Sequence, residues 1–416
     1  MERGQGVWQV QTPLVWPVAP ASYSYSSLHE IETCPLRWAT AHAGYGSLWP
    51  GRGYPRKPAI SALSGDVVHR SISTIIRASE GPGETGPASI AHGLRELGGI
   101  SKVLERSVIE VVTQWRSNPR AHDDDNHFLL ALSRRLPEFR LAVQTALNAM
   151  ASDPGTVLAQ RRSRSSGERG ALEPGWHSET RLAPASVNCV GVADLLRLSN
   201  DLCQIVDYKT GAPSPSHKDQ IRLYALLWAR DEEVNPSGRL ANSLMLVYPD
   251  QILEVQSPDD AGLERLEEAT AARIGAAAKA IAGSPPQAQV SAENCRFCDV
   301  KHLCSPYWTS ASQAAVRETP APIVRSLQGF VDGRRGDSTW TVVLEFDPYL
   351  DCGTAGVVTV PARWRLTVGQ RVRFMDARVD ADAAEAGVRV GLGSSSELFV
   401  VDGLPSTPAP VDRGNP

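Results

Sequence analysis

The sequence predicts an α/β domain followed by a small all-β domain. One observation is a pair of apolar runs, 187–198 and 202–211, that flank the polar turn Ser199-Asn200-Asp201. Runs rich in Val, Ile and Leu that are broken by turn-forming residues are typical of a β-hairpin. A second observation is apolar residues at helical spacing on both sides of this hairpin, and a third is a series of short β-prone runs beyond residue 323. These patterns predict strands and helices in one domain and strands alone in the next.

Composition suggests where the domains begin and end. The 416 residues are enough for two domains, and 42% apolar residues are ordinary for a globular core. The expected parts are an irregular arm over residues 1–21, an α/β domain over 22–308 with a helical insertion at about 90–150, a linker over 309–322, a small barrel over 323–402 and a disordered tail over 403–416.

Each strand of the predicted hairpin carries an aspartate, Asp194 in the first and Asp207 in the second. An unpaired ion is costly to bury, so carboxylates in apolar strands suggest a binding role. Lys209 lies one residue beyond Tyr208, on the same strand face as Asp207. Oxygen ligands suit Mg²⁺ or Mn²⁺, and a neighbouring lysine stabilises charge that develops on a phosphate. The pattern suggests a metal site that activates water, whereas a lone Asp-x-Lys more often marks an ordinary hairpin with surface aspartates.

Two predicted helices add residues to this region. The stretch 217–228 has apolar residues at helical spacing, with Gln220 and Tyr224 four residues apart on one face. The stretch 65–78 is amphipathic and carries His69 beside its apolar face. A lone histidine there is usually structural, so these residues alone leave its role open.

The motifs occur in a fixed order. Gly191-x-x-Asp194, Asp207-x-Lys209 and Gln220-x-x-x-Tyr224 follow one another in a short span, and Gly65-x-x-x-His69 lies upstream. This order resembles the RecB-like branch of the PD-(D/E)XK nuclease superfamily, in particular its CRISPR-associated and helicase-linked exonucleases. The resemblance implies a restriction-endonuclease-like core over residues 22–308, in which helices flank a mixed sheet.

The resemblance also assigns roles to individual residues. It implies a divalent metal held by His69, Asp194, Asp207 and the backbone carbonyl of Tyr208, a catalytic Lys209, and site-supporting or DNA-positioning roles for Gln220 and Tyr224. Glu179 resembles the acidic residue that some members place before the hairpin, and the alternative for it is a solvent-facing strand position.

The cysteines indicate a second centre. Cys295, Cys298 and Cys304 lie within ten residues, and Cys34 lies far upstream before a proline. In a cytosolic chain such a cluster favours metal or cluster chemistry over disulfides, and three thiols alone fit either zinc or iron–sulfur. The set resembles the iron–sulfur staple of a subset of RecB-like nucleases, which implies a [4Fe–4S] cluster held by these four cysteines. A zinc-stapled regulator is a further alternative, but it leaves the hairpin carboxylates unexplained.

The C-terminal strands predict a small antiparallel barrel, of OB type or otherwise. Such barrels often bind single-stranded nucleic acid through aromatic and basic side chains. The candidates are Trp364, Phe374, Arg363, Arg365, Arg371 and Arg373. A structural or protein-docking barrel is an equal alternative.

A basic segment precedes the hairpin. Arg161, Arg162, Arg164 and Arg169 lie among Ser and Gly without apolar periodicity. A flexible solvated loop is expected here in preference to a dedicated DNA contact, although a mobile basic loop also binds phosphates without sequence preference.

The expected function is a metal-dependent deoxyribonuclease, an exonuclease on single-stranded or end-containing DNA in repair, recombination or defence. The alternative is a catalytically silent DNA-binding or scaffolding subunit of a helicase–nuclease or defence complex. With 42 basic and 46 acidic side chains, attraction to DNA must come from local patches. No P-loop motif is present, so a helicase or defence-system partner would supply unwinding. No apolar run is long enough to span a bilayer and the start lacks a signal-peptide pattern, so a cytoplasmic protein without a membrane partner is expected.

Overall fold

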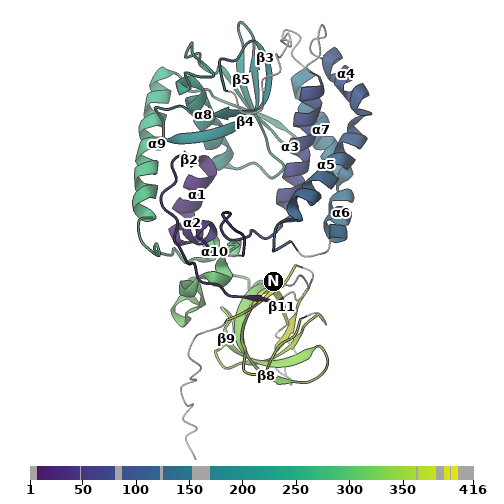
Figure 1. Ribbon diagram of the computed structural model, residues 1–416, viewed down its shortest axis with the longest axis vertical. Coiled ribbons are helices and arrows are strands. Elements are labelled where there is room, and N and C mark those ends of the chain that lie inside the picture. The colour runs from purple at the N-terminus through teal and green to yellow at the C-terminus, as the bar shows by residue number, and fades with distance from the viewer. Residues whose placement is uncertain are drawn as a thin grey trace, which may run out of the picture. The chain divides into compact units, whose positions relative to one another are not determined.

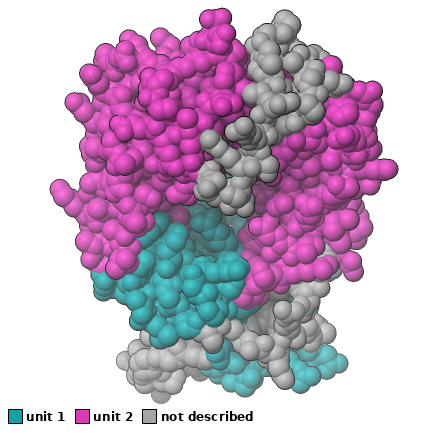
Figure 2. Space-filling model, turned by 45° about the horizontal axis from the view of Figure 1, so that its top comes forward, with its two compact units in different colours: residues 1–17, 33–56, 284–416 teal, residues 18–32, 57–283 magenta. Residues whose placement is uncertain are grey.

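The computed structural model describes residues 7–46, 48–79, 87–121, 125–151, 169–361, 364–380, 388–393 and 395–401. The chain forms two compact units (Figure 2). Unit 2 comprises residues 18–32 and 57–283, and unit 1 comprises residues 1–17, 33–56 and 284–416. Residues 284–308 therefore group with the C-terminal strands, whereas the sequence placed them with the α/β domain. The predicted domain boundaries stay a prediction, and the predicted tail lies outside the described residues.

The centre of unit 2 is a mixed β-sheet. Its strands are β2 (Tyr23–Ser24), β3 (Gly175–Leu182), β4 (Cys189–Leu198), β5 (Cys203–Tyr208), β6 (Ser243–Val247) and β7 (Ile252–Val255). The pairings β3–β4, β4–β5 and β6–β7 are antiparallel, while β2–β4 and β5–β6 are parallel. The register pairs Leu195 with Val206 and Leu198 with Cys203, which confirms the predicted hairpin.

Helices cover both faces of this sheet (Figure 1). On one side lie α8 (Pro215–Arg230) and α9 (Asp260–Ala280), and on the other lie α3 (Ile60–Ala78), α4 (Pro87–Leu97), α5 (Ile100–Trp115), α6 (Asp125–Ser133) and α7 (Leu136–Ala151). The helices α4 to α7 agree with the predicted helical insertion. Helix α1 (Tyr25–Thr33) is joined to α9 by an ion pair in which Arg273 Nε lies 2.7 Å from Glu32 Oε1.

Side-chain alternation along β5 determines the face of the sheet on which Asp207 lies. Val206 and Tyr208 are buried in the core shared with α3 to α7, whereas Ile205 is buried in the core shared with α8. Successive side chains of a strand point to opposite faces, so Asp207 points with Ile205 toward α8. Asp207 is only 2% exposed, and therefore it needs a partner on that side.

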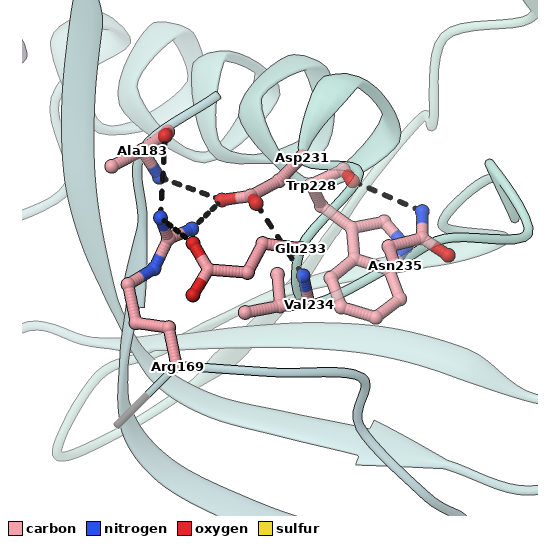
Figure 3. Close-up of polar contacts among 7 residues, drawn as sticks. All are labelled: Arg169, Ala183, Trp228, Asp231, Glu233, Val234 and Asn235. Carbon is pink, nitrogen blue, oxygen red and sulfur yellow. Dashed lines mark hydrogen bonds and ion pairs between the residues drawn. The ribbon is translucent and has the colours of Figure 1, made fainter. Parts of the chain in front are cut away.

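Arg169 closes the edge of unit 2 beside the end of α8 (Figure 3). Its guanidinium pairs with the buried Asp231, and its Nη1 lies 2.6 Å from Glu233 Oε2. Asp231 Oδ2 also accepts a hydrogen bond from the backbone N–H of Ala183, at 2.7 Å. Arg169 thus links the end of β3 to the end of α8, which corrects its assignment to a solvated basic loop. The residues 161–164 of that segment lie outside the described residues.

Unit 1 contains a closed β-barrel. Its strands are β8 (Val324–Arg334), β9 (Thr339–Phe346), β10 (Ala355–Thr359), β11 (Arg371–Asp380) and β12 (Val388–Gly391), with β13 (Glu397–Val400) and β1 (Val7–Gln9) added to it. The five strands follow the order β8-β9-β10-β12-β11, and pairing of β11 with β8 closes the ring. The β10–β12 pairing is parallel, so the barrel is not purely antiparallel as expected, and an OB topology stays a prediction.

The N-terminal arm is not wholly irregular. Residues 7–9 pair in parallel with β13, with Trp8 opposite Phe399. Trp8 packs against the apolar cluster that contains Tyr307 and Trp308. This packing gives the segment a fixed partner, which its Pro-containing surroundings in the sequence did not indicate.

The barrel residues expected to stack on bases are its own core. Trp364 is 2% exposed and Phe374 is fully buried among the inward-facing side chains. Arg373 is buried as well, and Arg371 Nε lies 2.7 Å from Glu345 Oε2. Trp364 and Phe374 lie in the barrel core and Arg373 is covered by Trp308, so these three side chains are unavailable for a nucleic-acid surface. Arg371 is about a third exposed but is paired with Glu345. Arg365 remains exposed, and Arg363 lies outside the described residues.

The rest of unit 1 is built from short helices. They are α2 (Pro35–His42), α10 (Ala292–Arg296) and the 3-10 helices η1 (Lys301–Leu303), η2 (Ser305–Trp308) and η3 (Ser310–Ser312). None of the helices in the described ranges has the length and apolar character needed to cross a membrane.

Candidate active site

Of the two motif glycines, Gly191 allows two elements of unit 2 to meet closely. A Cβ on Gly191 would lie 2.7 Å from the ring of Tyr224, so only glycine lets this ring pack directly against β4. Gly65 lies against Thr210, where a Cβ would reach ordinary contact at 3.4 Å from Oγ1, so the packing there does not require glycine. Gly191 therefore explains how α8 brings its polar residues to the end of the hairpin.

An acidic cluster forms where α3 meets the β3–β4 edge. Candidate ligand atoms of His69, Glu179 and Asp194 all lie within 4.8 Å of one another. His69 Nδ1 is 3.3 Å from Asp194 Oδ1, and Asp194 Oδ2 accepts a hydrogen bond from the backbone N–H of Tyr208 at 2.7 Å. The structure thus brings together residues from three elements that the sequence placed far apart.

Glu179 reaches this cluster through an unusual backbone. Its φ is +52°, although the β3–β4 register is continuous on both sides, with Ser178 opposite Leu195 and Thr180 opposite Ala193. A non-glycine residue in this region of φ is strained, and such strain is concentrated at functional sites. Glu179 is also exposed to solvent, so the alternative of a solvent-facing strand position stays open and its role as a ligand stays a prediction.

A hydrogen-bonded chain runs from Asp207 to α8. The Lys209 ammonium lies 2.7 Å from Asp207 Oδ2, in ion-pair contact. Lys209 Nζ donates to Gln220 Oε1 at 2.8 Å, and Gln220 Nε2 donates to the Tyr224 hydroxyl at 2.7 Å. The structure joins these four predicted residues in one network that fixes the position of the ammonium.

Without a bound cation, the carboxylates of this site repel one another. Burial, together with the charge of Asp194, raises the pKa of Asp207 to about 7 against the opposing effect of Lys209. Burial and Asp194 also raise the pKa of Glu179. Burial lowers the pKa of His69, but the charge of Asp194 and its hydrogen bond outweigh it and bring the value to about 9. The site thus favours bound positive charge, whether protons or a metal ion.

This electrostatic arrangement predicts how metal-free stability depends on pH. The pKa of His69 is raised from 6.5 to about 9, so its stabilisation is complete below pH 6.5 and is lost as the pH rises through 9. The raised pKa of Asp207 acts in the same direction up to about pH 7. We expect the melting temperature of metal-free protein to fall over this range, and the increase caused by Mn²⁺ to grow with pH. Thermal unfolding with and without Mn²⁺ between pH 6 and 9 checks this, and an increase that shrinks toward pH 9 would contradict it.

The four cysteines of the predicted cluster line one pocket in unit 1, together with Arg37 and Lys301. Burial raises the pKa of Cys298 to about 11, and burial together with the neighbouring thiols raises that of Cys304 to about 12. Among the described cysteines, no three sulfur atoms lie within 4.8 Å of one another.

Sequence reasoning passed over one residue beside Lys209. His217 lies three residues before Gln220, and its Nδ1 is 2.9 Å from the hydroxyl of Tyr248. The i, i+3 spacing with Gln220 was the available signal, because residues so spaced share a helix face.

The fold and the site together define a class: an α/β protein with carboxylates, an imidazole and a lysine gathered at the end of a β-hairpin. A model of the PD-(D/E)XK nuclease superfamily matches residues 22–305. The match covers more than half of the chain, and the protein therefore belongs to the PD-(D/E)XK nuclease superfamily. Divalent metals are the usual cofactors of these nucleases, and the acidic cluster of His69, Glu179 and Asp194 is a candidate metal site.

Comparisons with curated proteins and with solved structures do not narrow the function further. No curated protein matches this chain. The crystal structure of a protein named SSO0001 is similar at 21% identity and a TM-score of 0.18, over 31% of this chain and 60% of that one, so the match spans about 60% of that protein's length. A murine DNA-binding protein solved with double-stranded DNA is similar at 8% identity and a TM-score of 0.18, over 55% of this chain and 95% of that one. These scores carry no structural argument.

Proposed function

We propose that this protein is a divalent-metal-dependent deoxyribonuclease that hydrolyses phosphodiester bonds at the end of the β4–β5 hairpin. The observation that carries the proposal is the convergence of His69, Glu179 and Asp194 with the Asp207–Lys209 pair. A catalytically silent copy of the fold would have no use for a buried carboxylate held against a partly buried ammonium, since a buried carboxylate is costly. This argues against the silent alternative.

The donor set fits a hard divalent ion. Two carboxylates and an imidazole meet here, and Asp207 interacts electrostatically with Asp194 and His69. Burial and the charge of Asp194 raise the pKa values of Glu179 and Asp207. Carboxylate and carbonyl oxygens suit Mg²⁺ or Mn²⁺. The residues that would hold the ion are His69, Asp194, Asp207 and the backbone carbonyl of Tyr208, with Glu179 beside them. When bound, such an ion lowers the pKa of water and polarises a phosphate oxygen.

The protein's own residues provide the remaining functions. The Lys209 ammonium, fixed by Gln220 Oε1, is placed to stabilise negative charge on the phosphate under attack. Gln220 is in turn held by the Tyr224 hydroxyl, whose pKa burial raises, so that the hydroxyl stays protonated. Gln220 and Tyr224 are therefore positioning residues that act through Lys209.

The proposal extends to the substrate and the partners of the protein. The resemblance to RecB-like nucleases supports an exonuclease on single-stranded DNA or DNA ends, in repair, recombination or defence. A helicase or defence-system partner would present that DNA. Trp364 and Phe374 give no support to an aromatic stacking surface on the barrel, because both are buried.

We also propose that Cys34, Cys295, Cys298 and Cys304 hold a [4Fe–4S] cluster. The four cysteines line one pocket although Cys34 lies far from the other three in the sequence, which supports a shared centre. The resemblance to RecB-like nucleases with an iron–sulfur staple favours the cluster over zinc. The buried thiols have raised pKa values, so they require a compensating cation to ionise.

Cleavage of end-labelled DNA tests the nuclease proposal. Purified protein is incubated with linear single-stranded, linear double-stranded and circular single-stranded DNA, with Mg²⁺, Mn²⁺ or a chelator. We expect cleavage of linear DNA with either metal, none with the chelator, and intact circles. Cleaved circles would contradict exonuclease action, and intact DNA under every condition would contradict the nuclease proposal and favour the silent DNA-binding subunit.

A further inference from the structure

His217 lies in the first turn of α8, at the same end of the sheet as Lys209. The helix begins after Ser214, whose side chain accepts a hydrogen bond from the backbone N–H of Ser216, and His217 follows directly. His217 and Gln220 are three residues apart and share a helix face. Gln220 binds the Lys209 ammonium, and Lys209 also acts electrostatically on the imidazole, so His217 lies near the proposed reaction centre.

The imidazole is held from the sheet by Tyr248. This tyrosine is 1% exposed and follows Val247, which pairs with Tyr208 in the parallel β5–β6 ladder. The backbone N–H of Lys209 also donates to Val247 O at 2.9 Å, so Lys209 and Tyr248 leave neighbouring strands at the same level. Tyr248 therefore fixes His217 relative to Lys209 through the sheet itself.

The contact with Tyr248 engages one of the two imidazole nitrogens. The Tyr248 hydroxyl lies 2.9 Å from His217 Nδ1. In the tautomer in which this hydroxyl donates to Nδ1, the neutral ring carries its proton on Nε2. Burial and the charge of Lys209 lower the pKa of His217, which keeps the ring neutral. Within the described part of the chain, no second hydrogen bond or ion pair of His217 is found.

We propose that the Nε2–H of His217 donates a hydrogen bond to a DNA phosphate adjacent to the one that Lys209 contacts. The inference rests on the proposed nuclease function and deepens it by naming a substrate-binding residue. Gln220 separates His217 from Lys209 along the helix face, so a neighbouring phosphate suits its position better than the reacting one. A neutral donor contributes affinity without competing with the metal ligands for protons.

Two near-isosteric substitutions separate this role from a structural one. The side-chain amide of glutamine can replace the Nε2–H donor, whereas that of asparagine can replace only the contact of Nδ1 with Tyr248. We expect His217→Asn to raise the KM for DNA about tenfold with little change in kcat, and His217→Gln to remain within about threefold of wild type. The reverse order, with His217→Asn near wild type and His217→Gln impaired, would show that only the contact with Tyr248 matters and would overturn the proposal.

A phosphate scan locates the contact. Single methylphosphonate linkages, which remove the charge of one phosphate, are placed in turn along the DNA, and affinity is measured with a chelator present. At one position beside the scissile phosphate, we expect neutralisation to weaken wild-type binding severalfold but to leave His217→Asn unaffected. Equal losses for both proteins at every position would overturn the proposal.

The activity of the wild-type protein separates a failure of the inference about His217 from a failure of the proposed nuclease function. If wild-type protein cleaves DNA and both His217 variants match it in KM, the inference fails while the nuclease function stands. If wild-type protein cleaves no DNA with either metal, the nuclease function fails first, and the inference that rests on it is overturned with it.

Discussion

Lys209→Met is expected to lower the single-turnover rate of DNA cleavage by about a hundredfold to a thousandfold. Methionine keeps most of the apolar stem but removes the ammonium that lies 2.7 Å from Asp207 Oδ2 and donates to Gln220. Loss of one preorganised donor at a developing oxyanion has an effect of this size. The rate is measured with saturating Mg²⁺ and enzyme in excess, so that product release does not limit it.

A second cation of unit 2 provides the matched control. Arg230 lies at the other end of α8, where its Nε is 2.7 Å from Glu267 Oε2 and both side chains are about a third exposed. Arg230→Met also removes an ion-paired cation from this helix, but a partly exposed pair contributes little stability, so wild-type rates are expected. A Lys209→Met rate within tenfold of wild type would contradict the role given to Lys209.

Cys34→Ser is expected to remove most of the bound iron and to destabilise unit 1. Cys34 and Cys295 are far apart in the sequence but line the same pocket, so the centre closes a very large loop. Its binding free energy is part of the folding free energy, because the unfolded chain has no preformed site. We expect about four iron atoms per chain in anaerobically purified wild type and less than one in the variant, as measured by metal analysis.

Cys352→Ser is the matched control, because Cys352 is exposed and not part of the pocket. Its iron content and melting temperature should equal those of wild type. One tightly bound zinc ion and no iron in wild type would overturn the iron assignment and leave the four-cysteine site. Full iron retention by Cys34→Ser would exclude Cys34 as a ligand.

Loss of the centre held by the four cysteines should also destabilise the β-barrel. Cys295 and Cys304 pack against the apolar cluster that contains Phe346 and Phe399. Arg373 of β11 donates to the carbonyl of His302, and its guanidinium lies 4.8 Å from the Trp308 ring centroid. The cysteine segment and the barrel strands therefore share a core. For this reason, deleting the barrel is a poor way to isolate its function, and substitutions of exposed residues such as Arg365 are better.

The parts of the site that lie on regular elements could be predicted from the sequence. The hairpin followed from its apolar runs and polar turn, and the i, i+4 spacing placed Gln220 and Tyr224 on one face. Strand alternation then turns Asp207 toward α8, where Gln220 binds Lys209. Local periodicity was sufficient here because each residue acts within one element or between neighbours in the chain.

Other features depend on long-range geometry that no local pattern records. Glu179 joins the cluster only through a positive φ, and nothing in its sequence marks such a backbone. The barrel closes through pairing of β11 with β8, and β1 pairs with β13 from the other end of the chain. Trp364 was assigned to a stacking surface because composition does not tell which face of a short strand or loop is buried.

The central claim is that the buried carboxylate at the end of β5 is a ligand of a catalytic metal, and Asp207→Asn tests it most directly. Asparagine keeps the shape and still accepts a hydrogen bond from Lys209, but it removes the charge whose pKa burial raises to about 7. The measurement is the single-turnover rate of cleavage of end-labelled DNA with saturating Mn²⁺, for wild type and Asp207→Asn side by side. The account predicts a loss of at least about a thousandfold in a variant that, without metal, melts no lower than wild type at pH 8. A folded Asp207→Asn protein that cleaves at the wild-type rate would contradict it.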